Sequence, residues 1–390
     1  MATVTIYPGR EARLTGGHLW IYAGEIKNVD GTYAPGDIVD VRAADRTFIG
    51  RGYINLRSTI AVRLLTHRRE PIDEGFFRTR LAEALALRSR VATGTTASRL
   101  VYSEGDGLPG LIVDRYGDLL VLQCLTLGMA RQQPAIVRIL EELLSPAAVY
   151  ARNDAAVRRL EGLPAEVGFV SGQAPTVQEI VEGGLRFRVD LAAGHKTGFY
   201  LDQRENRQTV AAYAPPQGEV LDVFCYTGGF ALHAARAGGT VTGIDISAEA
   251  VAAATEHARL NGLTERCTFQ AGNAFDLLRG LARAGPRFDL VILDPPAFAP
   301  SRSRLERAAA GYKEINLRAL KVLRPGGILV SCSCSYHVSE ELLLALIAEA
   351  AADAHRRVRL LEARGQARDH PIHPGMPETR YLKCLILEVT

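Results

Sequence analysis

The sequence predicts a multidomain α/β protein with a small N-terminal β domain, a small α+β domain, and a C-terminal domain built on a doubly wound parallel sheet. Three observations predict this organisation. Short strand-like runs separated by glycines fill residues 1–68. Helix and strand patterns are mixed over residues 69–178. In residues 179–390 strands alternate with helices, which is typical of a parallel sheet covered by helices on both faces.

In the first domain, Gly36–Val41 and Phe48–Ile54 are expected to be strands of a barrel-type sheet. Arg10, Arg13 and Trp20 lie close together in the sequence. Arginines beside an aromatic ring can hold RNA phosphates and stack on bases. A structural tryptophan beside surface arginines explains the same pattern, so both interpretations stay open.

In the second domain, Phe76–Val91 has apolar residues at helical spacing, and Pro134–Leu144 is expected to be a second helix. Carboxylates occur in the turn Glu104–Asp106, where ordinary turn chemistry explains them without a functional site. The expected strands are Leu100–Tyr102, Leu111–Asp114, Leu119–Cys124 and Ala148–Ala151.

The elements of the third domain follow from its alternating pattern. The expected strands are Val220–Phe224, Thr240–Ile244, Cys267–Gln270, Leu290–Leu293, Ile328–Cys332 and Tyr381–Val389. The expected helices are Phe230–Ala237, Ala248–Asn261, Ala274–Ala284, Ala308–Leu323 and Glu340–Ala354.

Composition excludes several classes of protein. The six cysteines include no C-x-x-C pair, which fits neither a zinc site nor a secreted disulfide framework, and we expect no metal. No signal peptide and no apolar run of about 20 residues is found, so we expect a cytoplasmic protein without a membrane span. The formal charge of +3 does not by itself indicate nucleic acid. Arginine is strongly preferred to lysine, which suits phosphate recognition but also follows from a GC-rich genome.

Polar and glycine-rich motifs follow four successive strands of the third domain. Asp222–Phe230 is a glycine-rich turn after the first strand, and Asp245 ends the second, where it can accept hydrogen bonds from ribose hydroxyls. Asn273 follows the third strand and could bind an adenine edge. Asp294 follows the fourth in an Asp-Pro-Pro motif. Without a dinucleotide G-x-G-x-x-G, this order indicates S-adenosylmethionine rather than NAD as the cofactor.

Seven motifs make the match closer than the class level. They are Phe199–Arg204, Cys225–Phe230, Asp294–Phe298, Gly311–Asn316, Ser333–Ser335, Asp369–Pro371 and Tyr381–Cys384. With these motifs the chain resembles the bacterial 23S ribosomal RNA cytosine-C5 methyltransferases that begin with a PUA domain. The resemblance implies a PUA-like β-barrel, a small linker domain and a class I methyltransferase with a Rossmann-like sheet.

The resemblance also implies the functional residues. Arg204, with Arg10, Arg13 and Trp20, is expected to contact RNA, and Lys196 and Arg207 could add phosphate contacts or be solvated charges. The cofactor is expected to contact Tyr200, Asp202, Asp222, Phe224, Tyr226, Thr227, Gly228, Asp245, Ile246, Asn273, Ala274 and Asp294.

A strand runs directly into Cys332 and Cys334, and in a parallel sheet its carboxyl end lies where ligands bind. A thiolate that adds to cytosine C6 would make C5 nucleophilic. Period-two alternation puts both thiols on one side, so the sequence alone does not separate them, but the family pattern selects Cys334. Asp294 would bind the N4 or N3 edge of the cytosine. The position after Pro-Pro, where many relatives carry a second cysteine, is Ala297, so the base that removes the C5 proton is either water or Asp294.

Three other functions stay open. They are a guanine N2 or N7 methyltransferase, a non-catalytic RNA-binding protein with a retained methyltransferase fold, and a small-molecule methyltransferase. Relatives with Asp-Pro-Pro that act on guanine lack the Ser-Cys-Ser tract found here. A small-molecule methyltransferase would leave residues 1–178 unexplained. The expected partner is large-subunit ribosomal RNA, and a homodimer formed through the β domain stays open.

Overall fold

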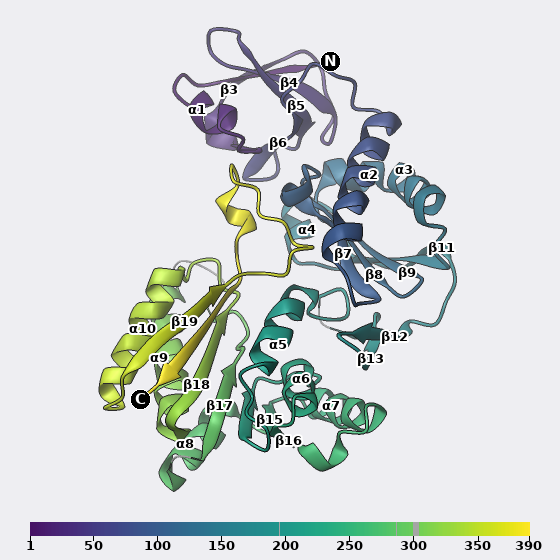
Figure 1. The fold of residues 1–390 in the computed structure, drawn as a ribbon. Helices are drawn as coiled ribbons and strands as arrows, with labels where there is room; N and C mark the ends of the chain where they lie inside the picture. Colours follow the sequence, from purple (N-terminus) through teal and green to yellow (C-terminus); the bar gives the residue numbers. More distant parts are fainter. Residues whose placement is uncertain (195, 286, 299–303) are drawn as a thin grey trace. The chain divides into compact units, whose positions relative to one another are not determined.

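The computed structural model describes residues 1–194, 196–285, 287–298 and 304–390. The chain forms two compact units (Figure 1). The first unit contains Met1–Ile180, Val189–Leu201 and Arg368–Thr379. The second unit contains Val181–Arg188, Asp202–Ala367 and Arg380–Thr390.

The first unit begins with a six-stranded sheet in the order β2-β6-β5-β4-β1-β3. Every neighbouring pair is antiparallel except β1 with β4. The side chains of Val4, Ile21, Val39 and Val62 are fully buried in one core inside the curved sheet. The elements are β1 (Thr3–Ile6), α1 (Glu11–Thr15), β2 (Trp20–Tyr22), β3 (Ile26–Asp30), β4 (Ile38–Arg42), β5 (Phe48–Ile54) and β6 (Ile60–Thr66).

A second sheet of the same unit has the order β11-β10-β9-β8-β7 and is covered by α2 and α3. Beyond it the hairpin β12–β13 leads to the second unit. The elements are α2 (Glu74–Val91), β7 (Ala97–Tyr102), β8 (Leu111–Tyr116), β9 (Leu119–Cys124), α3 (Leu127–Leu144), β10 (Ala148–Asn153), α4 (Val157–Leu160), β11 (Glu166–Gly172), β12 (Val177–Glu182) and β13 (Leu185–Asp190).

Helix α3 begins seven residues before the expected start at Pro134. A proline inside a helix removes a hydrogen bond, so prolines are most common in the first turn of a helix. Packing outweighs that preference, because Gly128 lies against the Tyr53 ring so closely that an added Cβ would be 2.1 Å from Cγ. The Tyr53 hydroxyl is also 2.9 Å from Oγ1 of Thr126, the residue that precedes α3, so the start of α3 is held to β5.

The second unit is a seven-stranded sheet in the order β16-β15-β14-β17-β18-β20-β19, the expected doubly wound arrangement. The first five strands are parallel, and β20 is antiparallel to both neighbours. The elements are α5 (Arg204–Ala211), β14 (Glu219–Val223), α6 (Gly229–Arg236), β15 (Thr240–Asp245), α7 (Ala248–Leu260), β16 (Cys267–Ala271), α8 (Ala274–Ala284), β17 (Phe288–Leu293), α9 (Leu305–Val322), β18 (Leu323–Ser333), α10 (Glu340–Asp353), β19 (Val358–Arg364) and β20 (Lys383–Val389).

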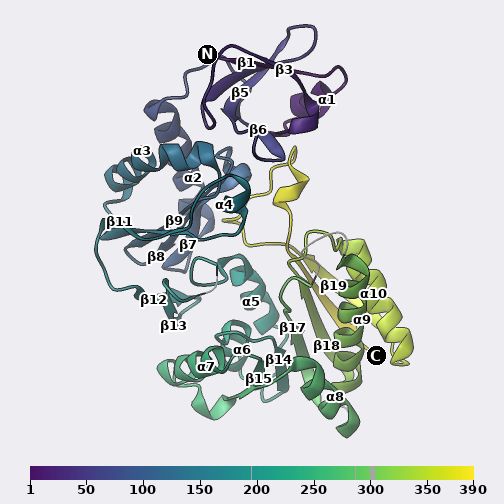
Figure 2. The ribbon, with the colours of Figure 1, turned by 180° about the vertical axis from the view of Figure 1, so that it is seen from behind.

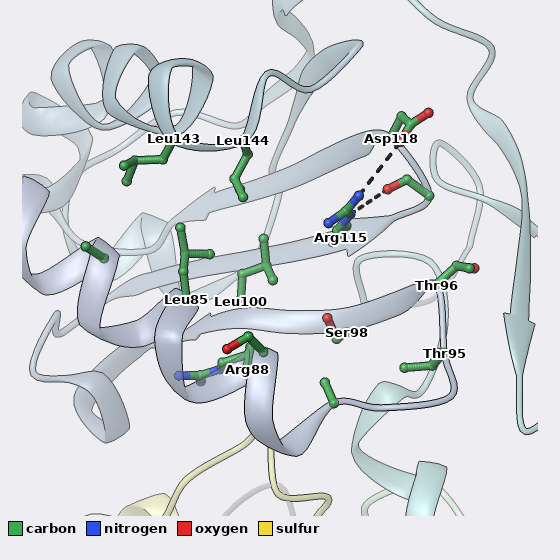
Figure 3. A pocket seen from close by; sticks show the side chains of 14 residues that line it. Leu85, Arg88, Thr95, Thr96, Ser98, Leu100, Arg115, Asp118, Leu143 and Leu144 are labelled. Atoms are coloured by element: carbon green, nitrogen blue, oxygen red, sulfur yellow. Dashed lines mark hydrogen bonds and ion pairs between the residues drawn. The ribbon is translucent and has the colours of Figure 1, made fainter.

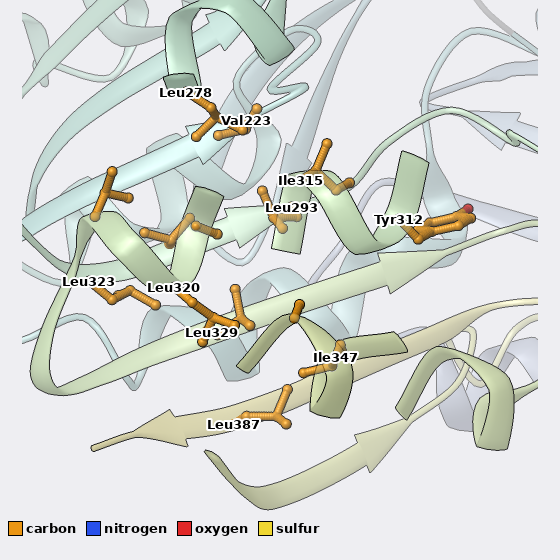
Figure 4. Packing of buried hydrophobic residues seen from close by; sticks show 14 of the residues in the cluster. Val223, Leu278, Leu293, Tyr312, Ile315, Leu320, Leu323, Leu329, Ile347 and Leu387 are labelled. Atoms are coloured by element: carbon orange, nitrogen blue, oxygen red, sulfur yellow. The ribbon is translucent and has the colours of Figure 1, made fainter. Parts of the chain in front are cut away.

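Alternate residues of the central strands enter different cores. Leu221 and Leu293 pack in the cluster under α8, α9 and α10, whereas Val220 and Ile292 pack under α5 and α6 on the other face. Figure 4 shows the first cluster, with Leu320 and Ile315 of α9 against Leu329 and Leu293, and Figure 2 shows the helices from behind. Two apolar faces explain why these strands read as continuous apolar runs.

Candidate active site

The turn between β14 and α6 has an unusual backbone. Phe224 and Tyr226 both have positive φ angles, of 66° and 48°, although neither is glycine. Gly228, with φ of 82°, then caps α6. Non-glycine residues in this region are strained and concentrate at functional sites. The turn therefore fits the expected ligand-binding role.

Asp245 fixes this turn from the end of β15. Its Oδ2 accepts from the Tyr226 amide at 2.8 Å, and its Oδ1 accepts from the Ser247 amide at 3.0 Å. Each carboxylate oxygen keeps further acceptor capacity, as ribose hydroxyls require. The next side chain, Ile246, is 74% exposed at the same edge and could cover an adenine ring.

Two buried polar atoms of the turn lack partners within the described part of the chain. They are Asp222 Oδ1 and Thr227 Oγ1. The other oxygen of Asp222 accepts from the Ala231 amide at 2.9 Å. Burial raises the pKa of Asp222 to about 8. Because buried polar atoms are normally paired, these two fit a ligand that brings a cationic donor, such as the amino group of S-adenosylmethionine.

Asn273 serves first as a helix cap. Its side-chain oxygen accepts from the Phe275 amide at 2.9 Å and so starts α8, whose first residue is Ala274. Its NH₂ group takes no part in this cap, and the residue is exposed. The adenine contact expected at Asn273 and Ala274 stays a prediction.

Asp294 is held by a residue that sequence reasoning missed. Its Oδ2 accepts from Gln203 Nε2 at 3.0 Å, and Gln203 Oε1 accepts from Asn206 at 2.7 Å. Arg364 donates to the other end of Asn206 at 3.1 Å. The signal in the sequence was the position of Gln203 inside the Phe199–Arg204 motif. This chain of side chains sets the orientation of the half-buried carboxylate.

The two other expected cofactor residues, Tyr200 and Asp202, belong to different units, because the first unit's segment Val189–Leu201 ends between them in the sequence. Tyr200 belongs to the first unit, where the Lys196 ammonium lies 4.6 Å from its ring centre. Asp202 begins the second unit and accepts from the Tyr381 hydroxyl at 2.5 Å. Their cofactor contacts stay predictions.

The structure separates the two thiols of β18. Cys332 is fully buried opposite Cys384 of β20. A hydrogen bond between the two thiols, together with burial, holds the pKa of Cys332 well above its ordinary value. Cys332 is therefore a neutral packing residue.

Cys334 lies just beyond the end of β18, so the alternation of strand side chains does not determine the direction of its thiol. The residue is partly exposed. The serines on either side of it point into the core, where the Tyr312 hydroxyl is 2.9 Å from Ser333 Oγ and 3.2 Å from Ser335 Oγ. Burial raises the pKa of Tyr312, and the charges of Cys334 and Asp294 both add to that rise. Asp294 follows β17 and Cys334 follows β18, and because these neighbouring strands are parallel, both residues lie at one edge of the sheet.

Aromatic rings form the base of this edge. The Phe298 ring, at the end of the Asp-Pro-Pro-Ala-Phe motif, lies 4.9 Å from Tyr312 and 6.3 Å from Phe224. Phe275 is 6.1 Å from Phe298. These rings connect the turn after β14 with Tyr312, whose hydroxyl lies beside the serines on either side of Cys334.

Two of the three residues of the first unit that were expected to contact RNA already bind carboxylates of that unit. Arg13 donates two hydrogen bonds to Glu25, and Trp20 Nε1 donates to Glu104 at 2.7 Å. Arg10 is exposed. These contacts favour a structural tryptophan, and RNA binding by the three residues stays a prediction.

Two arginines of α5 are buried rather than presented at the surface. Arg204 is 1% exposed and pairs with Glu205 at 3.4 Å, so RNA could reach its guanidinium only after a rearrangement. Arg207 binds the buried Glu182 through both carboxylate oxygens, at 2.7 and 2.6 Å. Burial opposes ionisation of Glu182, but Arg207 outweighs it and lowers the pKa to about 2. Arg207 is neither the phosphate contact nor the solvated charge that the sequence suggested.

A hollow of about 640 Å³ in the first unit contains none of the expected site residues. Leu85, Leu100, Leu143 and Leu144 line it beside an Arg115–Asp118 ion pair (Figure 3). Across the described ranges, no helix is long and apolar enough to cross a membrane.

Comparisons with known proteins agree with this geometry. A family model described as S-adenosylmethionine-dependent methyltransferase matches residues 103–378, and a model described as PUA-like domain matches residues 4–67. The chain is 41% identical over 393 residues to the ribosomal RNA large subunit methyltransferase I of Aeromonas hydrophila, and 40% identical over 392 residues to that of Shewanella amazonensis. Each alignment covers 99% of both chains.

Two solved structures share the fold over 100% of both chains at 20% identity. One is a candidate S-adenosylmethionine-dependent methyltransferase from Streptococcus mutans, with a TM-score of 0.85. The other is a candidate methyltransferase in complex with SAH, with a TM-score of 0.87. At this identity the likeness concerns the fold.

Proposed function

Because the chain belongs to the S-adenosylmethionine-dependent methyltransferase family, we propose that it methylates C5 of a cytosine in large-subunit ribosomal RNA. Membership of the family confirms the expected cofactor, the methyltransferase fold and the PUA-like first domain. The relatives named as ribosomal RNA large subunit methyltransferases support the RNA substrate, and such a substrate is consistent with the expected cytoplasmic location.

The choice of cytosine C5 rests on the partly exposed Cys334 at the ligand edge of the sheet. Its thiolate adds to C6, and the electrons of the C5–C6 double bond move to C5. S-adenosylmethionine, when bound, supplies the electrophilic methyl group that C5 then takes. Loss of the C5 proton restores the double bond and expels the Cys334 thiolate. Asp294 accepts from the N4 amino group and so holds the ring, while water or Asp294 takes the C5 proton.

Identification of the product tests this proposal. Large-subunit RNA from a strain that lacks the gene is incubated with the purified chain and S-adenosylmethionine carrying a heavy methyl group. The nucleosides are then separated and weighed. We expect heavy 5-methylcytidine as the labelled product. Labelled methylguanosine would make the chain a guanine methyltransferase, and absence of any labelled nucleoside together with retained RNA binding would indicate a non-catalytic protein.

Binding of S-adenosylmethionine is expected to tighten as the pH rises from 6 to 7.5. Asp222, whose pKa is about 8, is protonated over this range in the free protein, whereas pairing with the cofactor ammonium requires the carboxylate. Binding must therefore release a proton, and affinity should rise by at most about tenfold per pH unit. Calorimetry in two buffers of different ionisation enthalpy measures both the affinity and the proton.

The variant Asp222→Asn is expected to bind more weakly and to lose this pH dependence. Asp289→Asn is the matched control. Asp289 lies near the start of the neighbouring strand β17, at the opposite edge of the sheet from Asp222, and it binds the Glu219 amide and Arg324. An unchanged pH slope in Asp222→Asn would assign the proton to another group.

A further inference from the structure

Lys383 is a buried lysine beside the thiol edge. It begins β20 directly opposite Ser333 of β18 and is 6% exposed. Its ammonium donates to the Ser335 carbonyl at 2.7 Å and to the Tyr381 carbonyl at 2.8 Å. Both hydrogen bonds hold the charge next to the residue that follows Cys334.

These two acceptors are neutral, although buried lysines usually face a carboxylate. Glu340 of α10 raises the pKa of Lys383 through its negative charge, whereas Arg380 lowers it. Because Arg380 binds Glu340 at 2.7 Å, their effects on Lys383 largely cancel. Asp202, close in sequence to the partners of Asp294, is bound by the Tyr381 hydroxyl. Among the residues that the structure describes, the charges of Cys334 and Asp294 are weighed next.

The pKa of Lys383 reflects this environment. Burial lowers it to about 8, and the charge of Cys334 acts in the opposite direction. Electrostatic attraction is mutual, so a thiolate that favours the ammonium is itself favoured by it. Asp294 has the contrary effect on a thiolate, because like charges repel, and Tyr312 is neutral and bound to the serines.

We propose that Lys383 is a positioning residue that holds a positive charge beside Cys334 and thereby maintains its thiol as a thiolate. The thiol releases its proton to solvent, and the ammonium already present compensates the new negative charge against Asp294. The use of that thiolate in methylation rests on the proposed function, whereas its formation does not.

The experiment follows alkylation of Cys334 in the full chain without RNA or methyl donor. The rate of reaction with iodoacetamide is measured from pH 6 to 10 by mass spectrometry of the peptide that contains Cys334, and Cys334→Ser defines the background from Cys332. Only the thiolate reacts, so the midpoint of the pH profile reports its formation.

Lys383→Met is expected to move the midpoint upward by about one pH unit or more and to slow alkylation at pH 7.5 about tenfold. Lys383→Arg, which keeps the charge, should stay close to wild type. Lys383→Gln can still donate to a carbonyl but has no charge, so it should behave like Lys383→Met. Lys313→Met is the control, because Lys313 pairs with Glu349 and Asp353 at 3.1 Å on the surface of α9.

A wild-type profile in Lys383→Met or Lys383→Gln would overturn the proposal, because the Cys334 thiol would then ionise equally well without the ammonium. If Lys383→Met does not fold, Lys383→Gln decides the same point. A shifted midpoint in a chain that methylates guanine would leave this inference intact and refute cytosine-C5 methylation. An unshifted midpoint with 5-methylcytidine as product would do the reverse.

Discussion

A chain with Cys334 replaced by alanine is expected to bind S-adenosylmethionine but to form 5-methylcytidine at least about a thousandfold more slowly than wild type. The physical reason is that cytosine C5 is a weak nucleophile until a thiolate has added at C6. Cofactor binding should persist, because the turn after β14 and Asp245 do not depend on the thiol. Initial methylation rates and calorimetry measure the two quantities separately.

Cys332→Ala is the matched control for this variant. It removes a buried thiol two residues away, which packs against Cys384, and it should cost stability while most of the activity remains. RNA that carries 5-fluorocytidine adds a direct readout, because fluorine at C5 cannot be removed as a proton. Wild type should then accumulate a covalent RNA complex in a denaturing gel, and Cys334→Ala should not. Near wild-type methylation by Cys334→Ala would refute the covalent mechanism.

The sequence predicted the last domain well because its strands are apolar on both faces. Helix α8 has the expected bounds, Ala274–Ala284, since Asn273 caps it and apolar residues repeat at helical spacing. Strand β19, Val358–Arg364, was missed. It lies at the edge of the sheet, and its Leu360 and Leu361 are exposed, so charged and apolar residues do not alternate clearly.

The residues around the thiol show where sequence reasoning ends. Alternation treats Cys332 and Cys334 alike, and only the end of β18 at Ser333 separates them. Arginine composition suggests phosphate contacts, but it cannot reveal that Arg207 is committed to the buried Glu182. Lys383 did leave a signal, since a lysine inside the apolar run Leu382–Leu387 is unusual in a buried strand. Its partner carbonyls, however, become visible only once β18 and β20 are paired.

The site therefore combines two kinds of control over charge. Gln203 and Asn206 hold the Asp294 carboxylate by hydrogen bonds, whereas Lys383 acts on Cys334 through charge. A carboxylate near a thiolate is unfavourable unless a cation offsets it. The Asp294 carboxylate can hold the cytosine ring only if its oxygen is oriented toward the N4 amino group.

Asp294→Asn is expected to lower the methylation rate by about a hundredfold to a thousandfold while S-adenosylmethionine affinity changes little. The side-chain oxygen of the introduced asparagine can still accept from Gln203 Nε2, which leaves its NH₂ group directed at the N4 amino group of cytosine. Two donors then face each other, and the hydrogen bond that holds the ring is lost. Single-turnover rates at saturating cofactor measure this loss.

A purely structural effect of this substitution is distinguished by two comparisons. Asp289→Asn at the other end of β17 changes a carboxylate that binds Arg324 and the Glu219 amide, so it should alter stability and leave the rate. Gln203→Leu should reproduce part of the loss, because Asp294 would keep its charge but lose its fixed orientation. The preference for cytosine over uridine should also fall in Asp294→Asn, since an amide NH₂ can donate to uracil O4 where a carboxylate repels it. An unchanged preference, with a rate equal to that of Asp289→Asn, would remove Asp294 from recognition of the base.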